Sequence, residues 1–146
     1  MNRDFAEILQ ELSAAEADFL IVGAYAMAAH DQPRATGDID IWIRPSPANA
    51  QRVLSALVRF GAPLAELSVA DLSNPGVVFQ MGLPPNRIDI LTAISGVTFD
   101  EAWPNRLTIE QDSLRYHVIG KEDLIRNKRA AARPKDLVDA DVLESG

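Results

Sequence analysis

Strict alternation of apolar and polar residues marks one short stretch in the first half of the chain. In the segment 38–43, isoleucine occupies each odd position, whereas Asp38, Asp40 and Trp42 occupy the even ones. Successive side chains of a strand point to opposite faces, so this period of two predicts a strand. The strand would bury three isoleucines and hold two carboxylates side by side on its other face.

The same alternation recurs later in the chain, at 87–91. Its two isoleucines would face the core, and Arg87 and Asp89 would share the opposite face. A second apolar run, 77–81, precedes it across a short turn rich in proline, so the two runs predict a hairpin. If this hairpin joins the sheet of segment 38–43 in the right register, Asp89 lies on the face of the two earlier aspartates.

The remaining apolar pattern predicts helices around these strands. Apolar residues recur with helical spacing over 5–12, and the continuous apolar run 19–22 predicts a buried strand. Gly23 ends that strand, and the alanine-rich segment 24–30 favours a helix. Further helices are predicted at 46–61, 120–132 and 134–143, strands at 106–110 and 114–119, an irregular segment at 95–104, and a loop at 62–75 in which a short helix is left open.

Composition limits what this chain is expected to do. Its 146 residues suffice for one hydrophobic core, so a single domain spanning residues 1–146 is expected. The net charge of −7 argues against broad binding to nucleic acid, which needs a basic surface. The chain has no cysteine and two histidines, which excludes disulfides, thiol chemistry and a histidine-based metal cluster. Without a long apolar run or a secretion signal, a cytoplasmic protein with no membrane contact is expected.

The paired aspartates Asp38 and Asp40 are the first candidate site residues. Two carboxylates about 7 Å apart on one strand face repel each other and gain nothing for the fold. A cation between them would remove the conflict, and oxygen ligands of this kind suit magnesium or manganese. The alternative is a half-exposed strand whose acidic face is simply solvated, and the alternation alone leaves both interpretations open.

Gly23 is a second candidate, because it separates a buried strand from a helix. The free backbone N–H groups at the start of such a helix, and the positive end of its dipole, favour a phosphate above the strand. The alternative is a glycine that merely permits a tight turn. When Gly23 is considered by itself, the tight turn is the better supported interpretation.

Basic residues cluster in the last third of this acidic chain. Lys128 follows Leu124 by four positions, which keeps it off the fully exposed face of its predicted helix. Asp136 and Asp139 share one side of the last helix. The simpler interpretation is a solvated, salt-bridged helix pair. In the functional one, Lys128 or Arg133 reaches the polyphosphate of a nucleotide, and the two aspartates orient the basic side chains.

Taken in order, these features resemble the nucleotidyltransferase superfamily that includes DNA polymerase beta. Its pattern is a glycine followed by serine or a second glycine, a helix and loop, an Asp-x-Asp strand, and a third carboxylate on a later strand. Thirteen residues separate Ala24 from Asp38, which is similar to the usual gap. Ala24 departs from the pattern, since it offers a phosphate only its backbone N–H. The matching residues are Gly23, Asp38, Asp40 and Asp89.

The tail looks most similar to the minimal and AbiEii-like nucleotidyltransferases of bacterial toxin–antitoxin and phage-defence systems. The segment 122–128 reads Glu-Asp-Leu-Ile-x-x-Lys and 133–139 reads Arg-Pro-Lys-Asp-x-x-Asp, like the C-terminal lysine and Asp-x-x-Asp motifs of that group. The resemblance covers roughly residues 19–143. It implies an α/β (α+β) fold, in which a small mixed sheet of four to six strands carries helices mainly on one face. The aspartate faces of the two acidic strands would stay open.

The resemblance also implies an activity. A nucleoside monophosphate would pass from a nucleoside triphosphate to a hydroxyl group of a protein, a tRNA end or a small molecule, with two Mg²⁺ or Mn²⁺ ions as cofactors. Both the catalytic and the metal-binding residues would be Asp38, Asp40 and Asp89. The nucleotide-binding residues would be Gly23, Ala24, Arg34, Thr36 and Lys128.

The same resemblance implies candidate partners and a non-enzymatic alternative. Besides the nucleoside triphosphate, a partner protein of a toxin–antitoxin pair is a candidate, while a nucleic-acid acceptor is left open but not favoured. The alternative to an enzyme is a binding module of the same fold with weak or no catalysis, acting as an antitoxin or assembly partner. We expect ordinary structural or surface roles for His30 and His117, and a neighbouring helix or loop that covers Trp42.

Overall fold

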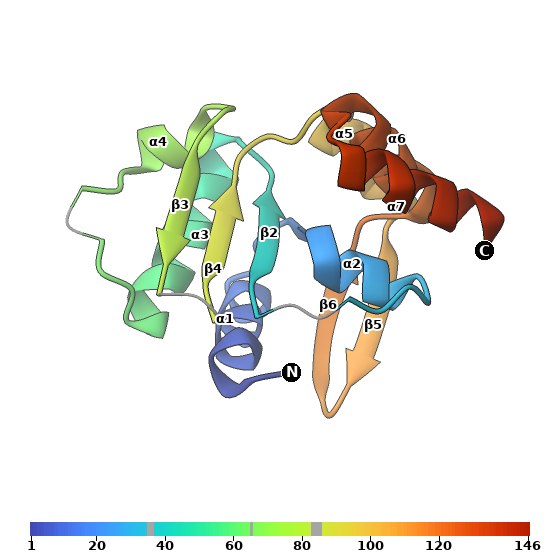
Figure 1. Ribbon diagram of the computed structural model, residues 1–146. Coiled ribbons are helices and arrows are strands. Elements are labelled where there is room, and N and C mark those ends of the chain that lie inside the picture. Colours follow the sequence, from blue (N-terminus) through green and yellow to red (C-terminus); the bar gives the residue numbers. More distant parts are fainter. Residues whose placement is uncertain (35–36, 65, 83–85) are drawn as a thin grey trace.

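Helices and strands alternate along the chain in the computed structural model, which describes residues 1–34, 37–64, 66–82 and 86–146 (Figure 1). Each predicted helix and strand is present, with ends shifted by at most two residues. None of the helices in these ranges is long and apolar enough to cross a membrane. The strands are β1 (Phe19–Val22), β2 (Ile39–Ile43), β3 (Val78–Met81), β4 (Ile88–Leu91), β5 (Leu107–Gln111) and β6 (Leu114–Val118). The helices are α1 (Arg3–Ala14), α2 (Gly23–Ala29), α3 (Pro47–Phe60), α4 (Val69–Ser73), α5 (Phe99–Ala102), the 3₁₀ helix η1 (Trp103–Asn105), α6 (Lys121–Ala131) and α7 (Pro134–Ser145).

The strands form a mixed sheet in the order β3-β4-β2-β1-β6-β5. β3 and β4 are antiparallel neighbours, so the predicted hairpin is confirmed. β1 runs antiparallel to β2, whereas β2 is parallel to β4 and β1 is parallel to β6. The predicted fold class, a small mixed α/β sheet with helices packed on it, is therefore confirmed.

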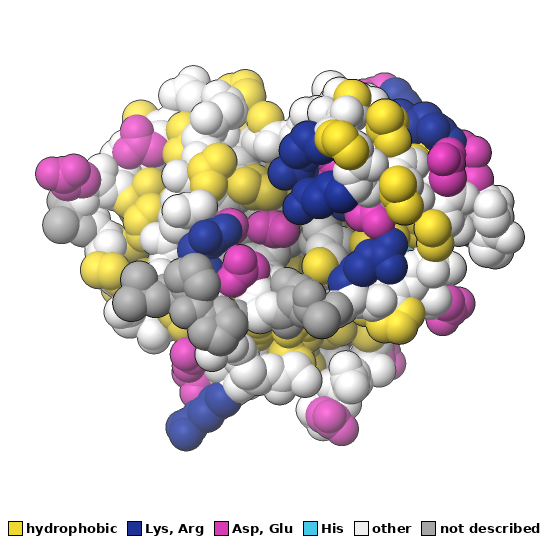
Figure 2. All heavy atoms as spheres, in the orientation of Figure 1, with side chains coloured by type: hydrophobic (Ala, Val, Ile, Leu, Met, Phe, Trp, Pro, Cys, Tyr) yellow, Lys and Arg dark blue, Asp and Glu magenta, His cyan; other side chains and the backbone are white. Residues whose placement is uncertain are grey.

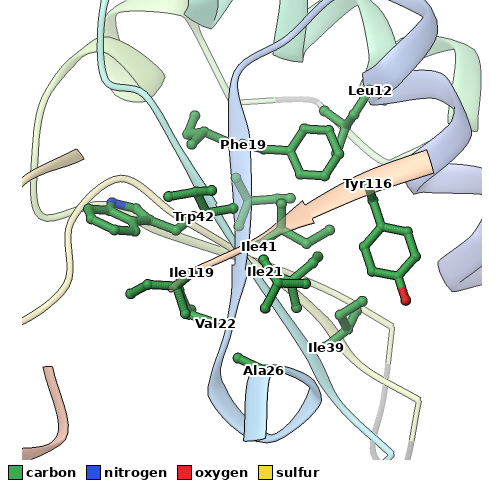
Figure 3. Packing of buried hydrophobic residues seen from close by; sticks show 14 of the residues in the cluster. Leu12, Phe19, Ile21, Val22, Ala26, Ile39, Ile41, Trp42, Tyr116 and Ile119 are labelled. Atoms are coloured by element: carbon green, nitrogen blue, oxygen red, sulfur yellow. The ribbon is translucent and has the colours of Figure 1, made fainter. Parts of the chain in front are cut away.

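The isoleucine face of β2 lies in the core, as its alternation predicts. Ile39, Ile41 and Ile43 are fully buried, and Figure 3 shows Ile39 and Ile41 clustered with Ile21 of β1. α1 and α3 pack against each other behind the sheet in Figure 1, and α2 lies in front of it. α6 and α7 pack together beyond the end of β6 (Figure 1). The opposite face of β2, with its aspartates, therefore lies on the side of α2.

The prediction of an irregular segment at 95–104 is wrong in part, because some of this segment is helical. The Thr98 hydroxyl accepts the backbone N–H of Glu101 at 3.2 Å, and the Glu101 carboxylate accepts the N–H of Thr98 at 2.9 Å. This capping box starts α5, which is too short to show helical periodicity in the sequence. Phe99 of α5 packs edge-on against Trp42 with ring centroids 5.0 Å apart, so Trp42 is covered as expected.

Both histidines make structural contacts, as expected. His30 Nε2 lies 2.8 Å from the carbonyl oxygen of Ile119, at the end of β6. His117 Nδ1 lies 2.9 Å from the Thr108 hydroxyl of the neighbouring strand. These contacts tie the end of α2 and the strand β5 to β6.

Candidate functional site

The turn from β1 into α2 brings the backbone against a carboxylate. Gly23 has φ +70°, in the left-handed region that side chains rarely adopt. A Cβ atom at this position would lie 2.2 Å from Oδ2 of Asp40, far inside van der Waals contact. The tight-turn interpretation of Gly23 is therefore incomplete, because the close approach of Asp40 also requires glycine.

The parallel pairing of β2 with β4 places carboxylates side by side. Asp40 lies directly opposite Asp89 in this ladder, so the register is one that puts Asp89 on the face of the two earlier aspartates. Asp38 directly precedes β2, and its Oδ1 accepts the backbone N–H of Arg87 at 3.1 Å. All three aspartates line one pocket of about 490 Å³. Figure 2 shows acidic side chains at the centre of this face and basic side chains on both sides of them.

The other walls of this pocket come from α2 and from the C-terminal helices. Its volume falls within the range of roughly 300–1,000 Å³ that is usual for small-molecule sites. Gly23 and Ala24 line it at the start of α2. Among the described residues, four basic ones also line it, together with neutral residues and Asp136, and these four are Arg87, Lys128, Arg133 and Lys135.

The carboxyl group of Asp40 is poised between its charged and neutral forms. Its pKa is raised from an ordinary value of 3.8 to about 6. Burial is the largest cause, and the charge of Asp89, a hydrogen bond with the Asp89 carboxyl and the charge of Asp38 add to it, while Arg87 opposes the rise. The cluster therefore stores electrostatic repulsion that a bound cation would relieve.

This raised pKa makes stability depend on pH in a specific direction. Because the folded chain holds the Asp40 proton up to about pH 6 and the unfolded chain releases it near 3.8, ionisation of Asp40 destabilises the fold as pH rises between these values. We expect the Asp40→Asn variant to exceed the wild type in free energy of unfolding by about 1–3 kcal/mol above pH 6, and the difference to vanish by about pH 4. Urea unfolding across this range measures it.

The difference in free energy of unfolding between the wild type and the Asp40→Asn variant reports on the ionisation of Asp40. Asp136 and Asp139 have lowered pKa values, because hydrogen bonds and charges of basic partners outweigh the effect of burial, so their stabilisation is lost as pH falls. That loss is the same in the wild type and in the Asp40→Asn variant, and it cancels in the difference. A difference that stays constant from pH 4 to pH 7 would contradict a raised pKa at Asp40.

Arg87 is a candidate site residue that is not among the predicted catalytic, metal-binding or nucleotide-binding residues. Its Nε donates to Asp89 Oδ1 at 2.8 Å and its Nη2 donates to Asp89 Oδ2 at 3.0 Å. The same Nη2 lies 3.5 Å from Oδ2 of Asp38. The sequence pattern that could have indicated this role is the alternation in β4, which puts Arg87 on the same face as Asp89.

One expectation about the acidic faces is wrong. Both aspartate faces are expected to stay open, but the Asp89 side chain is only 8% exposed, against 34% for Asp38. The guanidinium of Arg87 and the carboxyl of Asp40 cover the Asp89 oxygens. Asp89 is therefore a buried partner within the cluster, and Asp38 is its more accessible member.

The ion pairs that Lys128 of α6 makes with α7 are buried, whereas those of Arg129 lie at the surface. Lys128 Nζ lies 3.2 Å from Asp139 Oδ2 and 3.6 Å from Asp136 Oδ1, and its side chain is 11% exposed. Arg133 Nε donates to Asp136 Oδ2 at 2.7 Å. The two aspartates therefore orient basic side chains that line the pocket, as the functional interpretation of their spacing predicts. The solvated, salt-bridged helix pair describes the Arg129 ion pairs but not the buried contacts of Lys128.

The predicted nucleotide-binding residues fall into three groups. Gly23, Ala24 and Lys128 line the same pocket as the three aspartates. Arg34 is not among the described residues that line it, and its guanidinium pairs with Asp139 on α7. Thr36 lies outside the residues that the structure describes.

The carboxylates of Asp38, Asp40 and Asp89 line one open pocket, and carboxylate oxygens are ligands that hard divalent ions prefer. Across residues 1–34, 37–64, 66–82 and 86–146, however, no group of three acidic or imidazole side chains is already arranged around an ion position. The Arg87 guanidinium engages both oxygens of Asp89. The three aspartates supply the kind of donor that a divalent ion prefers, with Arg87 inside the cluster.

The fold of this chain is similar to that of a solved structure. A protein of Thermotoga maritima, described in its crystal structure as a "putative nucleotidyltransferase", superposes with a TM-score of 0.62, covering 98% of this chain and 89% of its own. At 13% sequence identity this likeness concerns the fold alone. No curated protein matches the chain.

The family follows from the sequence itself. A family model described as nucleotidyltransferase of unknown function (DUF6036) matches residues 3–145, and the chain belongs to that family. The superfamily indicated by the order of Gly23, the Asp-x-Asp strand and Asp89 is therefore confirmed. The finer likeness to the AbiEii-like group stays a prediction.

Proposed function

We propose that this protein transfers a nucleoside monophosphate from a nucleoside triphosphate to a hydroxyl acceptor, at the pocket of the three aspartates. The observation that carries the proposal is the convergence of Asp38, Asp40 and Asp89 on one pocket that four basic side chains among the described residues also line. The carboxylate cluster, in which the pKa of Asp40 is raised, costs stability, so a site that retains it is a functional candidate. A divalent ion and a polyphosphate together match both halves of this lining.

Each wall of the pocket then has a role. Mg²⁺ or Mn²⁺, held by the aspartates, would supply charge neutralisation at the triphosphate and activation of the acceptor hydroxyl. Lys128 would hold the phosphate chain from α6, where Asp136 and Asp139 keep its Nζ in place. The backbone N–H groups of Gly23 and Ala24 would bind phosphate oxygens from the opposite side. The acceptor oxygen then bonds to the α-phosphorus, a carboxylate of the cluster takes its proton, and pyrophosphate leaves.

A second candidate is a binding module with weak or no catalysis. Two observations favour it, namely the pairing of Arg87 with Asp89 and the alanine at position 24. In this role the chain would act as an antitoxin or assembly partner of the kind found in toxin–antitoxin pairs. Such a module has little use for the repulsion among its three aspartates, which makes the enzyme the better supported candidate.

Labelling separates the two candidates. The purified chain is incubated with each labelled nucleoside triphosphate and Mg²⁺ in a cell lysate, and the labelled species are identified. The enzyme transfers label to one acceptor class, and the Asp38→Asn variant, which keeps an oxygen to accept the Arg87 N–H, does not. Absence of transfer by the wild type, or equal transfer by the variant, would contradict the proposed activity.

Lys128→Met tests the basic wall. The change leaves Asp139 with Arg34 and leaves Asp136, which is 1% exposed, with Arg133 alone. We expect a loss of about 1–3 kcal/mol in the free energy of unfolding, together with weaker nucleoside triphosphate binding. Urea unfolding and calorimetry measure the two effects.

Arg129→Met is the matched control on the same helix. Arg129 pairs with Asp141 and Glu144 on the surface, and its side chain is 41% exposed. An exposed ion pair contributes little to stability, so little stability and no nucleotide affinity should be lost. Equal effects of the two substitutions would contradict a special position for Lys128.

A further inference from the structure

Arg87 bridges two of the three carboxylates in the pocket. Its guanidinium makes a two-pronged contact with Asp89, at 2.8 and 3.0 Å, and its Nη2 also lies 3.5 Å from Asp38 Oδ2. Its backbone N–H donates to Asp38 Oδ1 at 3.1 Å. Arg87 is thus bound to the cluster by both its side chain and its backbone.

This contact resists displacement. A two-pronged arginine–carboxylate pair is among the stronger ion pairs, and a guanidinium stays charged at any pH at which proteins fold. Because the Asp89 side chain is only 8% exposed, removing the guanidinium would leave a buried charge without compensation. An incoming metal ion would therefore meet Asp89 already neutralised.

The charge balance points the same way. With all three aspartates ionised, the cluster and Arg87 together carry a net charge of −2, which a single divalent ion neutralises. When no nucleotide is bound, a second ion would make the centre positive, next to the guanidinium of Arg87 and opposite the basic wall that contains Lys128 and Arg133. Such an arrangement is electrostatically unfavourable in a partly buried pocket.

We infer that Arg87 takes the place of one cation of a two-ion centre, so that the pocket binds one divalent ion, through Asp40 together with Asp38. The inference rests on the proposed metal dependence and changes its stoichiometry, because the family resemblance implies two ions. Arg87 then neutralises the Asp89 side of the centre permanently. A neutral side chain at position 87 opens that side to a second ion.

Manganese binding to the full chain tests this inference without any turnover. The number of Mn²⁺ ions bound per chain is measured by equilibrium dialysis and by electron paramagnetic resonance, with the Asp40→Asn variant giving the number bound elsewhere. We expect one ion at the site in the wild type, two in Arg87→Gln with the spectrum of a coupled pair, and one in Arg87→Lys, which keeps the positive charge. Arg129→Gln, a surface control, should bind as the wild type does.

Each other result has a definite meaning. Two ions in the wild type would overturn the inference and leave the proposed function standing. A folded Arg87→Gln variant that still binds one ion would overturn the role given to Arg87. No ion at the wild-type site would overturn the inference and the proposed metal dependence together. If Arg87→Gln does not fold, the wild-type number alone decides between one ion and two.

Discussion

Replacing Asp40 by asparagine is expected to stabilise the protein and to abolish its ion-dependent nucleotide binding. The new amide would keep a hydrogen bond with the Asp89 carboxylate but remove the charge that Asp89 and Asp38 repel. The free energy of unfolding should rise by about 1–3 kcal/mol at neutral pH, because a tenfold difference in proton affinity between the folded and unfolded chain corresponds to about 1.4 kcal/mol. Urea unfolding measures the gain, and equilibrium dialysis with Mn²⁺ measures the loss of binding.

Asp18→Asn is the control for this prediction. Asp18 Oδ2 accepts a hydrogen bond from Arg44 Nε at 2.9 Å, so its charge has a partner rather than a repelling neighbour. Neutralising it should leave stability unchanged or lower it, without an effect on Mn²⁺ binding. If Asp40→Asn instead lowers stability while ion binding persists, the aspartates are an ordinary structural cluster.

Gly23→Ala is expected to have the opposite effect on stability, with the same loss of binding. The new Cβ would meet Asp40 Oδ2 at 2.2 Å, and φ at this position is +70°. Left-handed backbone and steric overlap together should cost about 2–4 kcal/mol in the free energy of unfolding. Relief of the overlap requires Asp40 to move, so ion binding should weaken at the same time. Thermal melts and Mn²⁺ titration follow the two quantities.

Gly61→Ala separates the two causes of this loss. Gly61 has φ +90° and ends α3, but nothing lies within 4 Å of a Cβ built there. Gly61→Ala should therefore lower the free energy of unfolding only by the cost of a left-handed backbone, about 1 kcal/mol. In the Gly23→Ala, Asp40→Ala double variant, the steric overlap is gone, and the stability loss should shrink toward that of Gly61→Ala. Equal losses for Gly23→Ala and Gly61→Ala would show that Asp40 does not press against this turn.

Alternation was sufficient to predict that the aspartates share one face of the sheet. The period of two in segments 38–43 and 87–91 assigns each side chain to a face, but a slip of two residues keeps both faces unchanged, so the pairing of Asp40 with Asp89 comes from the structure. The fold class followed from the family resemblance. The close approach of Gly23 to Asp40 depends on how a turn meets a neighbouring strand, which no local pattern contains.

The positions of the long basic side chains were harder to predict. A strand pattern assigns Arg87 to a face but does not show that its guanidinium folds back onto Asp89. Likewise, the resemblance assigns Arg34 to the nucleotide, whereas its partner is Asp139, 105 residues later in the chain. Contacts between residues so distant in sequence depend on the packing of α7 and have no signature in the local sequence.

The acidic cluster has an electrostatic cost that binding of an ion and a nucleotide would explain. Asp40 is destabilising at neutral pH, and Gly23 is fixed by the space that Asp40 needs. Functional sites commonly retain groups that lower stability in this way. In the proposed function, Lys128 would face the phosphate chain, and Arg87 would lie within the carboxylate cluster.

Calorimetric titration of nucleoside triphosphates, with and without Mg²⁺, decides whether the three aspartates form a metal-dependent nucleotide site. We expect binding of at least one triphosphate to the wild type when Mg²⁺ is present, little binding when it is absent, and none to the Asp38→Asn variant under either condition. Binding that is independent of Mg²⁺, or that is unchanged by Asp38→Asn, would contradict such a site at these aspartates.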